Sequence, residues 1–216
     1  MTKKRRPPRI GICTYCHATT RLTNDHVPPR NLFPSGTTGI VKVPACEPCN
    51  NGAKKDDEYF RLSISVSHDP HAAPQGADVT LAAIERLKDP RKTGLRKRML
   101  SQIRGQWMEV DTVRIHSVLR RIVKGLYFHR KGERLPPSFK VEVFSFRDFY
   151  RLPDSEVRTL VLHALSAVSE HRVGDHVFAY RYVSAAEGTS HSAWYLRFFN
   201  SVEFIALTGQ RTYPKP

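Results

Sequence analysis

The sequence has no cysteine beyond residue 49, although four cysteines lie before that point. A disulfide framework in a small secreted protein normally extends through the whole chain, so this distribution argues against one. No apolar run reaches the roughly 18–20 residues needed to span a bilayer. The basic N-terminus "MTKKRRPPRI" is not followed by the apolar stretch and cleavage site of a secretory signal. We therefore expect a cytoplasmic protein without a membrane partner.

Acidic residues are few in comparison with basic ones. Asp and Glu number 20 against 35 Lys and Arg, which gives a formal net charge of +15. Each phosphate neutralised by a basic side chain releases condensed counterions, so this charge favours a nucleic-acid partner. A soluble basic protein without such a partner is the alternative. Hydrophobic residues make up 40% of the chain, enough for a packed core, so extensive disorder is not expected.

Four segments are expected along the chain. Residues 1–10 form a flexible basic arm, and residues 11–67 form a module that contains all the cysteines. Residues 68–80 are a linker rich in Pro, Ala and Gly. Residues 81–216 combine a helical segment with an antiparallel sheet and a helix, for nucleic-acid or partner recognition. The predicted fold class is therefore α+β.

Two regions carry helical periodicity. Residues 79–131 are predicted to be helical, with one apolar face made of Ile115, Val118, Leu119, Ile122 and Leu126. Residues 154–171 are predicted to form an amphipathic helix with Asp154 as its N-cap. Its buried face is expected to consist of Val157, Leu160, Val161, Leu165 and Val168.

Strand signals are concentrated at the C-terminal end of the chain. β-branched and aromatic residues predict strands at 139–146, 177–183, 193–199 and 202–208, with a tight turn at Asn200–Ser201. The aromatic side chains there interleave with arginines, which suits either base stacking or, more simply, a packed sheet. A further short strand is predicted in "GIVKVPAC", just before the last cysteine pair.

The four cysteines form two Cys-x-x-Cys pairs, "CTYC" at 13–16 and "CEPC" at 46–49. Two such pairs in a cytosolic chain indicate a tetrahedral structural zinc site. The alternative is a pair of redox motifs, but these usually head a helix in a βαβ unit, and no such unit is visible. The predicted zinc ligands are Cys13, Cys16, Cys46 and Cys49.

Between the cysteine pairs lies "LTNDHVPPRNLFPSG", in which Asp25 directly precedes His26. Histidine has an unperturbed pKa near 6.5, so it can act as a neutral base at physiological pH. Aspartate is a hard oxygen ligand suited to Mg²⁺ or Mn²⁺. Neighbouring residues on a strand point to opposite sides, so the pair can aim one group at a metal and the other at water. An amide from Asn50 or Asn51 would complete the metal site.

These motifs resemble those of the HNH endonucleases, a family of ββα-metal nucleases. The resemblance rests on "CTYC", "DHVPP", "VPACEPCN" and Lys54, and it covers about residues 11–60. It implies that His26 is the general base and that Asp25 and Asn50 hold a catalytic divalent ion. It also implies a structural role for the zinc. The family's middle Asn is replaced by Val41, which puts the loop geometry in doubt.

The choice between the two asparagines stays open at this point. Asn51 has the family's spacing to Lys54, whereas Asn50 has the spacing to Cys49 and is preferred.

The predicted function is therefore metal-dependent hydrolysis of phosphodiester bonds in DNA. Three alternatives remain, one of which is a degenerate nuclease retained as a structural or interaction protein. The same site could act on RNA, and a non-catalytic zinc-ribbon protein that binds nucleic acid would explain the cysteines and the charge equally well. The sequence does not specify a recognition sequence, single- or double-strand cutting, or an oligomeric state.

Overall fold

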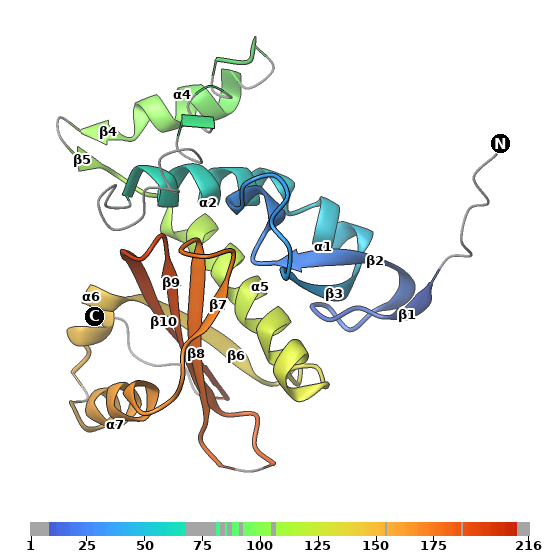
Figure 1. The fold of residues 1–216 in the computed structure, drawn as a ribbon, viewed down its shortest axis with the longest axis vertical. Helices are drawn as coiled ribbons and strands as arrows, with labels where there is room; N and C mark the ends of the chain where they lie inside the picture. The colour runs from blue at the N-terminus through green and yellow to red at the C-terminus, as the bar shows by residue number, and fades with distance from the viewer. Residues whose placement is uncertain are drawn as a thin grey trace.

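The computed structural model describes most of the chain as a mixed α+β structure with three antiparallel sheets (Figure 1). The described residues are 9–67, 81–82, 85, 88–90, 93–104, 107–153, 155–186 and 188–210. Most of the predicted basic arm, the whole predicted linker 68–80 and the predicted N-cap Asp154 lie outside them. Among the described helices, none is both long and apolar enough to cross a membrane.

The N-terminal sheet has three strands, β1 (Ile10–Ile12), β2 (Thr19–Val27) and β3 (Val41–Cys46), in the order β1-β2-β3. The β2–β3 register pairs Asp25 with Val43 and His26 with Lys42. Because successive strand residues face opposite sides, Asp25 is only 6% exposed while His26 is half-buried. A short 3₁₀ turn, η1 (Arg30–Leu32), follows β2.

Two helices follow the small sheet and complete a β-β-α arrangement. The first, α1 (Glu47–Asn51), carries the last cysteine, and the second is α2 (Lys54–Ser67). Seven consecutive residues of α2, from Tyr59 to Ser65, are buried, so this helix is covered on more than one side. One contact crosses to the C-terminal sheet, where the Phe60 and Phe198 rings meet edge to face at 5.3 Å.

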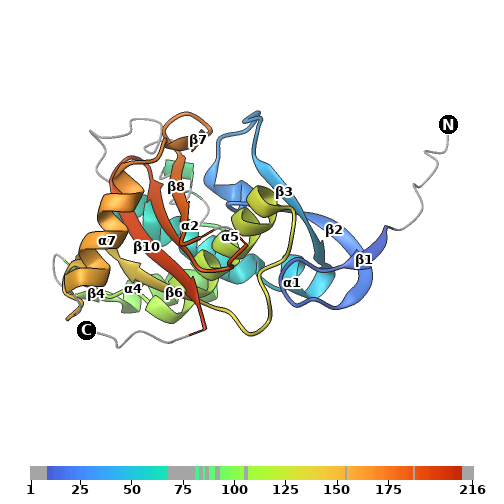
Figure 2. The same ribbon diagram turned by 90° about the horizontal axis from the view of Figure 1, so that it is seen from below.

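The longest helix, α5 (Thr112–Lys131), lies between the small sheet and the five-stranded sheet (Figures 1 and 2). Asp111 caps its N-terminus by accepting a hydrogen bond from the Arg114 backbone N–H at 3.3 Å. Gly132, with a left-handed φ of 73°, ends it. The predicted apolar face is confirmed, since Ile115, Val118, Leu119, Ile122 and Leu126 are all buried.

The C-terminal sheet has the strand order β6-β10-β9-β8-β7 and is antiparallel throughout. The predicted strands are confirmed, and β7 is an addition. Their bounds are β6 (Lys140–Ser145), β7 (His171–Val173), β8 (Phe178–Ser184), β9 (Ser192–Phe198) and β10 (Val202–Gly209). Asn200 has a positive φ in the turn between the last two strands.

Both faces of this sheet are covered. Trp194, Leu196 and Phe198 belong to the core that α5 shares. The alternate residues of the sheet pack instead with residues from α6 (Phe146–Tyr150) and α7 (Ser155–Ser166), which lie on the other side of the sheet from α5 (Figure 2). The aromatic side chains of these strands therefore serve mainly as core, because Tyr180, Trp194 and Phe198 are nearly inaccessible.

Three expectations about the helices are wrong. The helix predicted over 154–171 ends earlier, since α7 stops at Ser166, Val168 lies beyond it and His171 already belongs to β7. Residues 79–131 do not form a continuous helical region, because a two-stranded hairpin, β4 (Ile103–Arg104) and β5 (Trp107–Met108), separates α4 (Thr93–Ser101) from α5. Leu160 was expected to be buried but is 68% exposed. The reason is that α7 rests on β8 and β9 along a narrow stripe, in which Leu165 is buried.

Gly125 marks the closest approach between α5 and the small sheet. A Cβ atom there would lie 2.6 Å from Val27 Cγ2 and 3.4 Å from the Tyr15 hydroxyl. We expect Gly125→Ala to lower the free energy of unfolding by about 1–3 kcal/mol, because the packed strand must shift. Gly94→Ala is the control, since nothing lies within 4 Å of its Cβ position in α4, and alanine there should be neutral or stabilising. Equal urea midpoints for the two variants would contradict this packing.

Candidate metal centre and catalytic site

The four cysteines converge on one point although they come from two distant segments. Their Sγ atoms all lie within 4.8 Å of one another, and those of Cys16 and Cys46 are 3.7 Å apart. A tetrahedral zinc ion with Zn–S distances of about 2.3 Å requires sulfurs about 3.8 Å apart. The donor set and its spacing therefore fit a zinc ion bound by Cys13, Cys16, Cys46 and Cys49.

Backbone hydrogen bonds support a negatively charged sulfur in this cluster. The N–H groups of Tyr15 and Cys46 donate to Cys13 Sγ at 3.4 and 3.3 Å. Burial alone would raise the pKa of the Cys13 thiol, but hydrogen bonds from the backbone outweigh it and lower the pKa to about 7. Thiolates are the form in which cysteine binds a metal.

Two side chains contact the same oxygen of the Asp25 carboxylate. The Tyr15 hydroxyl donates to Asp25 Oδ2 at 2.8 Å, and Arg121 Nε lies 3.5 Å from the same oxygen. Tyr15 is the third residue of "CTYC", so the zinc knuckle itself supplies a contact to this carboxylate. Asp25 Oδ1 takes no part in these two contacts.

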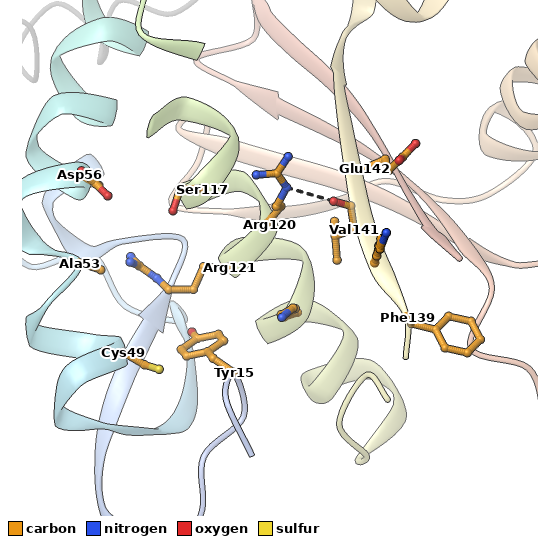
Figure 3. Close-up of a pocket in the computed structure, with 12 residues that line it drawn as sticks. Tyr15, Cys49, Ala53, Asp56, Ser117, Arg120, Arg121, Phe139, Val141 and Glu142 are labelled. Atoms are coloured by element: carbon orange, nitrogen blue, oxygen red, sulfur yellow. Dashed lines mark hydrogen bonds between the residues drawn. The ribbon is translucent and has the colours of Figure 1, made fainter. Parts of the chain in front are cut away.

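Arg121 links Asp25 to a second carboxylate, Asp57. Its side chain extends from α5 toward the start of α2 (Figure 3) and contacts Asp57 Oδ1 through Nη2. The side chains of Arg121, Asp25 and Asp57 are 12%, 8% and 14% exposed, so the three charges are shielded from water together. Burial raises the pKa of Asp57 to about 6, although Arg121 opposes that effect.

His26 opens into a cavity of about 330 Å³ that it shares with Asp25, Asn31, Asn50 and Asp57. Burial lowers the pKa of the imidazole, and the nearby Lys42 lowers it further. A lowered pKa favours the neutral ring, which is the form that can accept a proton.

The two asparagines after the last cysteine differ in position. Asn50 lines this cavity, and its amide nitrogen donates to Thr23 Oγ1 at 2.9 Å and to the Asn24 carbonyl at 3.3 Å. These bonds orient the amide and leave its oxygen available to a ligand. Asn51 is exposed, and its amide donates to Glu47 at 3.4 Å. Geometry thus brings Asn50, rather than Asn51, together with Asp25 and His26.

Another asparagine enters the cavity from η1. Asn31 donates through Nδ2 to the Asp57 carbonyl at 3.1 Å, while its Oδ1 is buried without a hydrogen-bond partner. Val41, at the position where the HNH resemblance predicts an Asn, pairs with Val27 in the sheet. An amide is therefore supplied to this region from a different point of the chain.

The oxygen donors of this cavity are of a kind that suits Mg²⁺ or Mn²⁺. Among the described residues, only the four cysteines form a group of three or more His, Cys, Asp or Glu side chains close enough to share an ion. A divalent ion in this cavity would therefore have at most two such side chains as ligands, and the Asn50 and Asn31 amide oxygens and water would have to complete its coordination. Mg²⁺ commonly binds in this way, with few protein ligands and several retained waters.

Several groups that build this site were not identified from the sequence: Tyr15, Asn31, Asp57 and Arg121. Asn31 carried a weak signal, since it lies five residues after His26 in the same turn-rich stretch. Arg121 carried none, because it is one of many basic residues on a predicted helix and lies 96 positions from Asp25.

Loss of one cysteine should remove the zinc. We expect purified wild type to contain one zinc per chain, and Cys46→Ser to contain almost none and to lose several kcal/mol of stability, because metal-binding energy contributes to folding. His17→Asn is the control. His17 adjoins Cys16 but is not needed once four sulfurs fill the tetrahedron, so its zinc content and melting temperature should match wild type. Elemental analysis and thermal unfolding provide the two measurements.

Comparison with known proteins identifies no relative of this chain. No family model, curated protein or solved structure matches it. Any functional interpretation therefore depends on the residues and geometry of the chain itself. Those establish a mixed α+β protein with a four-cysteine cluster that could hold a zinc ion.

Proposed function

We propose that this protein is a metal-dependent endonuclease of the HNH type, with DNA as its substrate. One observation carries the proposal. Strand β2 and helix α1 bring Asp25, His26 and Asn50 to a single cavity beside a four-cysteine cluster. A basic net charge of +15 is consistent with a polyanionic substrate.

In the proposed reaction, neutral His26 takes a proton from a water molecule in the cavity. The water oxygen attacks the scissile phosphorus in line, the bond from phosphorus to the 3′ oxygen breaks, and the departing oxygen takes a proton from solvent. Asp25 and Asn50 would hold Mg²⁺ or Mn²⁺, and the ion would polarise the phosphate and offset charge on the leaving oxygen. The ends produced are a 5′-phosphate and a 3′-hydroxyl, as the family resemblance implies.

Tyr15 and Arg121 are proposed as positioning residues in this reaction. Both contact Asp25 Oδ2, which leaves Oδ1 as the oxygen that would face the ion. Asp57 balances the Arg121 charge, so Asp25 keeps a net negative environment despite the neighbouring guanidinium. Partners of this kind typically change metal affinity or activity 10–100-fold when they are removed.

A non-catalytic zinc protein that binds nucleic acid is the second candidate. It is favoured by the position of Arg121. Its guanidinium already contacts Asp25, the carboxylate that a catalytic ion would have to bind, and it also contacts Asp57. Wild-type inactivity with Mg²⁺, Mn²⁺, Co²⁺ and Ni²⁺ would support it. Parallel digestion of plasmid, single-stranded DNA and structured RNA separates the DNA enzyme from a ribonuclease with the same site.

Replacing the proposed base tests the enzyme directly. We expect His26→Ala to slow metal-dependent plasmid nicking by about 10²–10⁴-fold, the usual contribution of a general base, with little change in DNA affinity. His163→Ala is the matched control, since His163 is exposed on α7 at a distance from the site. Equal nicking by wild type and His26→Ala would rule out this assignment.

The pH profile of the same assay gives a second readout. Because the base must be neutral, the rate should rise with pH until His26 is deprotonated. The pKa of His26 is lowered by burial, and a bound cation would lower it further, so the midpoint should fall below 6.5. A midpoint above that value would be inconsistent with His26 as the base.

Tyr15→Phe removes one donor to Asp25 while keeping the ring. We expect the Mn²⁺ concentration needed for half-maximal nicking to rise by about 10-fold or more, with one zinc per chain retained. Tyr150→Phe, at an exposed tyrosine on α6, should behave as wild type. If Tyr15→Phe alters zinc content or melting temperature but not the Mn²⁺ requirement, Tyr15 has only a structural role.

A further inference from the structure

A second and larger cavity, of about 690 Å³, lies on the other side of the start of α2 from the His26 cavity (Figure 3). One wall comes from α1 and the start of α2, the floor from α5, and the other wall from β6. The α5 residues that line it, Ser117, Arg120, Arg121 and Lys124, recur at helical spacing and so share one face. We refer to this cavity as the α5 groove.

Charges in the α5 groove fall into two groups. Asp56 is already paired with Arg114, at 2.7 Å between Oδ1 and Nε, and Arg121 is paired with Asp25 and Asp57. Three further cations line the groove: Arg120, Lys124 and Lys140. Within the described parts of the chain, none of these three is paired with a carboxylate.

One of the three cations is held in place. Arg120 Nε donates to the Val141 carbonyl at 3.1 Å (Figure 3). This bond holds the guanidinium against the wall formed by β6, and it does not use the two terminal nitrogens. Apart from Asp56, which is paired with Arg114, the lining contains one carboxylate, Glu142. The three cations outnumber it, so the groove carries a net positive charge.

The α5 groove is separated from the His26 cavity by a thin partition. Tyr15 and Arg121 line the groove, and the same two side chains bind Asp25, which lines the His26 cavity. Along α2, Asp56 faces the groove and its neighbour Asp57 faces the His26 cavity. A polymer that crosses the start of α2 would therefore meet both surfaces.

We propose that the α5 groove binds the phosphodiester backbone of a nucleic-acid strand next to the segment that enters the His26 cavity. The cations are spread out rather than convergent: Arg120 and Lys124 are about 6 Å apart along the helix axis, and Lys140 comes from the wall formed by β6. This distribution suits successive phosphates better than one phosphate group. The inference rests on the proposed function for the path of the strand, but binding is measured separately from cleavage.

The test compares two double variants with the same loss of charge. Lys124→Gln/Lys140→Gln removes two groove cations, whereas Arg147→Gln/Arg151→Gln removes two exposed cations at α6, beyond the other end of β6. Fluorescence anisotropy with a labelled 20-nucleotide single strand, and with its duplex, is recorded at several salt concentrations. The protein is zinc-loaded and no Mg²⁺ or Mn²⁺ is added, so binding is observed without cleavage.

We expect the groove variant to bind at least 10-fold more weakly and the α6 variant to match wild type. The slope of log affinity against log salt should shrink by about 1.4 for the single strand, or about 1.8 for the duplex, which corresponds to two lost phosphate contacts. Circular dichroism and zinc content confirm that both variants are folded. Equal weakening of both variants would overturn the inference, because it would show only a general effect of net charge.

Three further outcomes are informative. If inorganic phosphate or a mononucleotide saturates the protein at micromolar concentration while the oligonucleotide does not bind, the groove is a small-anion site and the inference fails. If wild type never cuts but the groove variant alone loses oligonucleotide affinity, the groove inference stands and the nuclease proposal fails. If wild type cuts and the groove variant binds normally, only the groove inference is wrong.

Discussion

The contact of Arg121 with two largely shielded carboxylates is the interaction on which the candidate site depends. Asp25 and Asp57 are shielded from water, and an isolated charge in such a place would be strongly unfavourable. One guanidinium from α5 compensates both. Its planar array of donors can reach two acceptors at once, which a lysine ammonium on a flexible stem does less well. The orientation of Asp25 therefore depends on how α5 packs.

That packing is in turn set by the apolar core. The buried face of α5 belongs to one continuous cluster that includes Val27 and Val43 of the small sheet and Trp194 and Phe198 of the large one. A small sheet needs a hydrophobic face or packing against a helix in order to be stable. The four-cysteine cluster ties its ends together, and Gly125 allows α5 to approach Val27 closely. The candidate metal centre and the core thus support the same few strands.

The positive charge of the chain is not distributed uniformly around this site. Next to Asp25 the basic side chain is matched by carboxylates, so the His26 cavity remains suited to a cation. On the neighbouring face of α2, Arg120, Lys124 and Lys140 remain without carboxylate partners among the described residues. The proposed cation site beside the proposed anion-binding groove is an arrangement suited to phosphodiester chemistry. It also offers a reason why a strongly basic protein would keep an acidic pocket.

Local sequence determined those features that depend on spacing alone. Two Cys-x-x-Cys pairs specified the four-cysteine cluster, the apolar repeat from Ile115 to Leu126 specified the buried face of α5, and alternation along β2 separated Asp25 from His26. Periodicity indicates which side of an element is apolar, but not how much of that side finds a partner. Leu160 is exposed for this reason, since α7 meets the sheet along a narrow stripe.

The tertiary structure alone decided what surrounds the candidate catalytic pair. The contact between Arg121 and Asp25 joins positions 96 residues apart, and the amide of Asn31 reaches Asp57 across 26. No spacing rule relates such positions, because the first contact requires α5 to pack against the small sheet and the second requires η1 to pack against α2. The sequence by itself determined which chemical groups the protein possesses and on which local elements they lie. Burial and long-range packing decided which of them share a cavity, which are neutralised, and which remain open to a ligand.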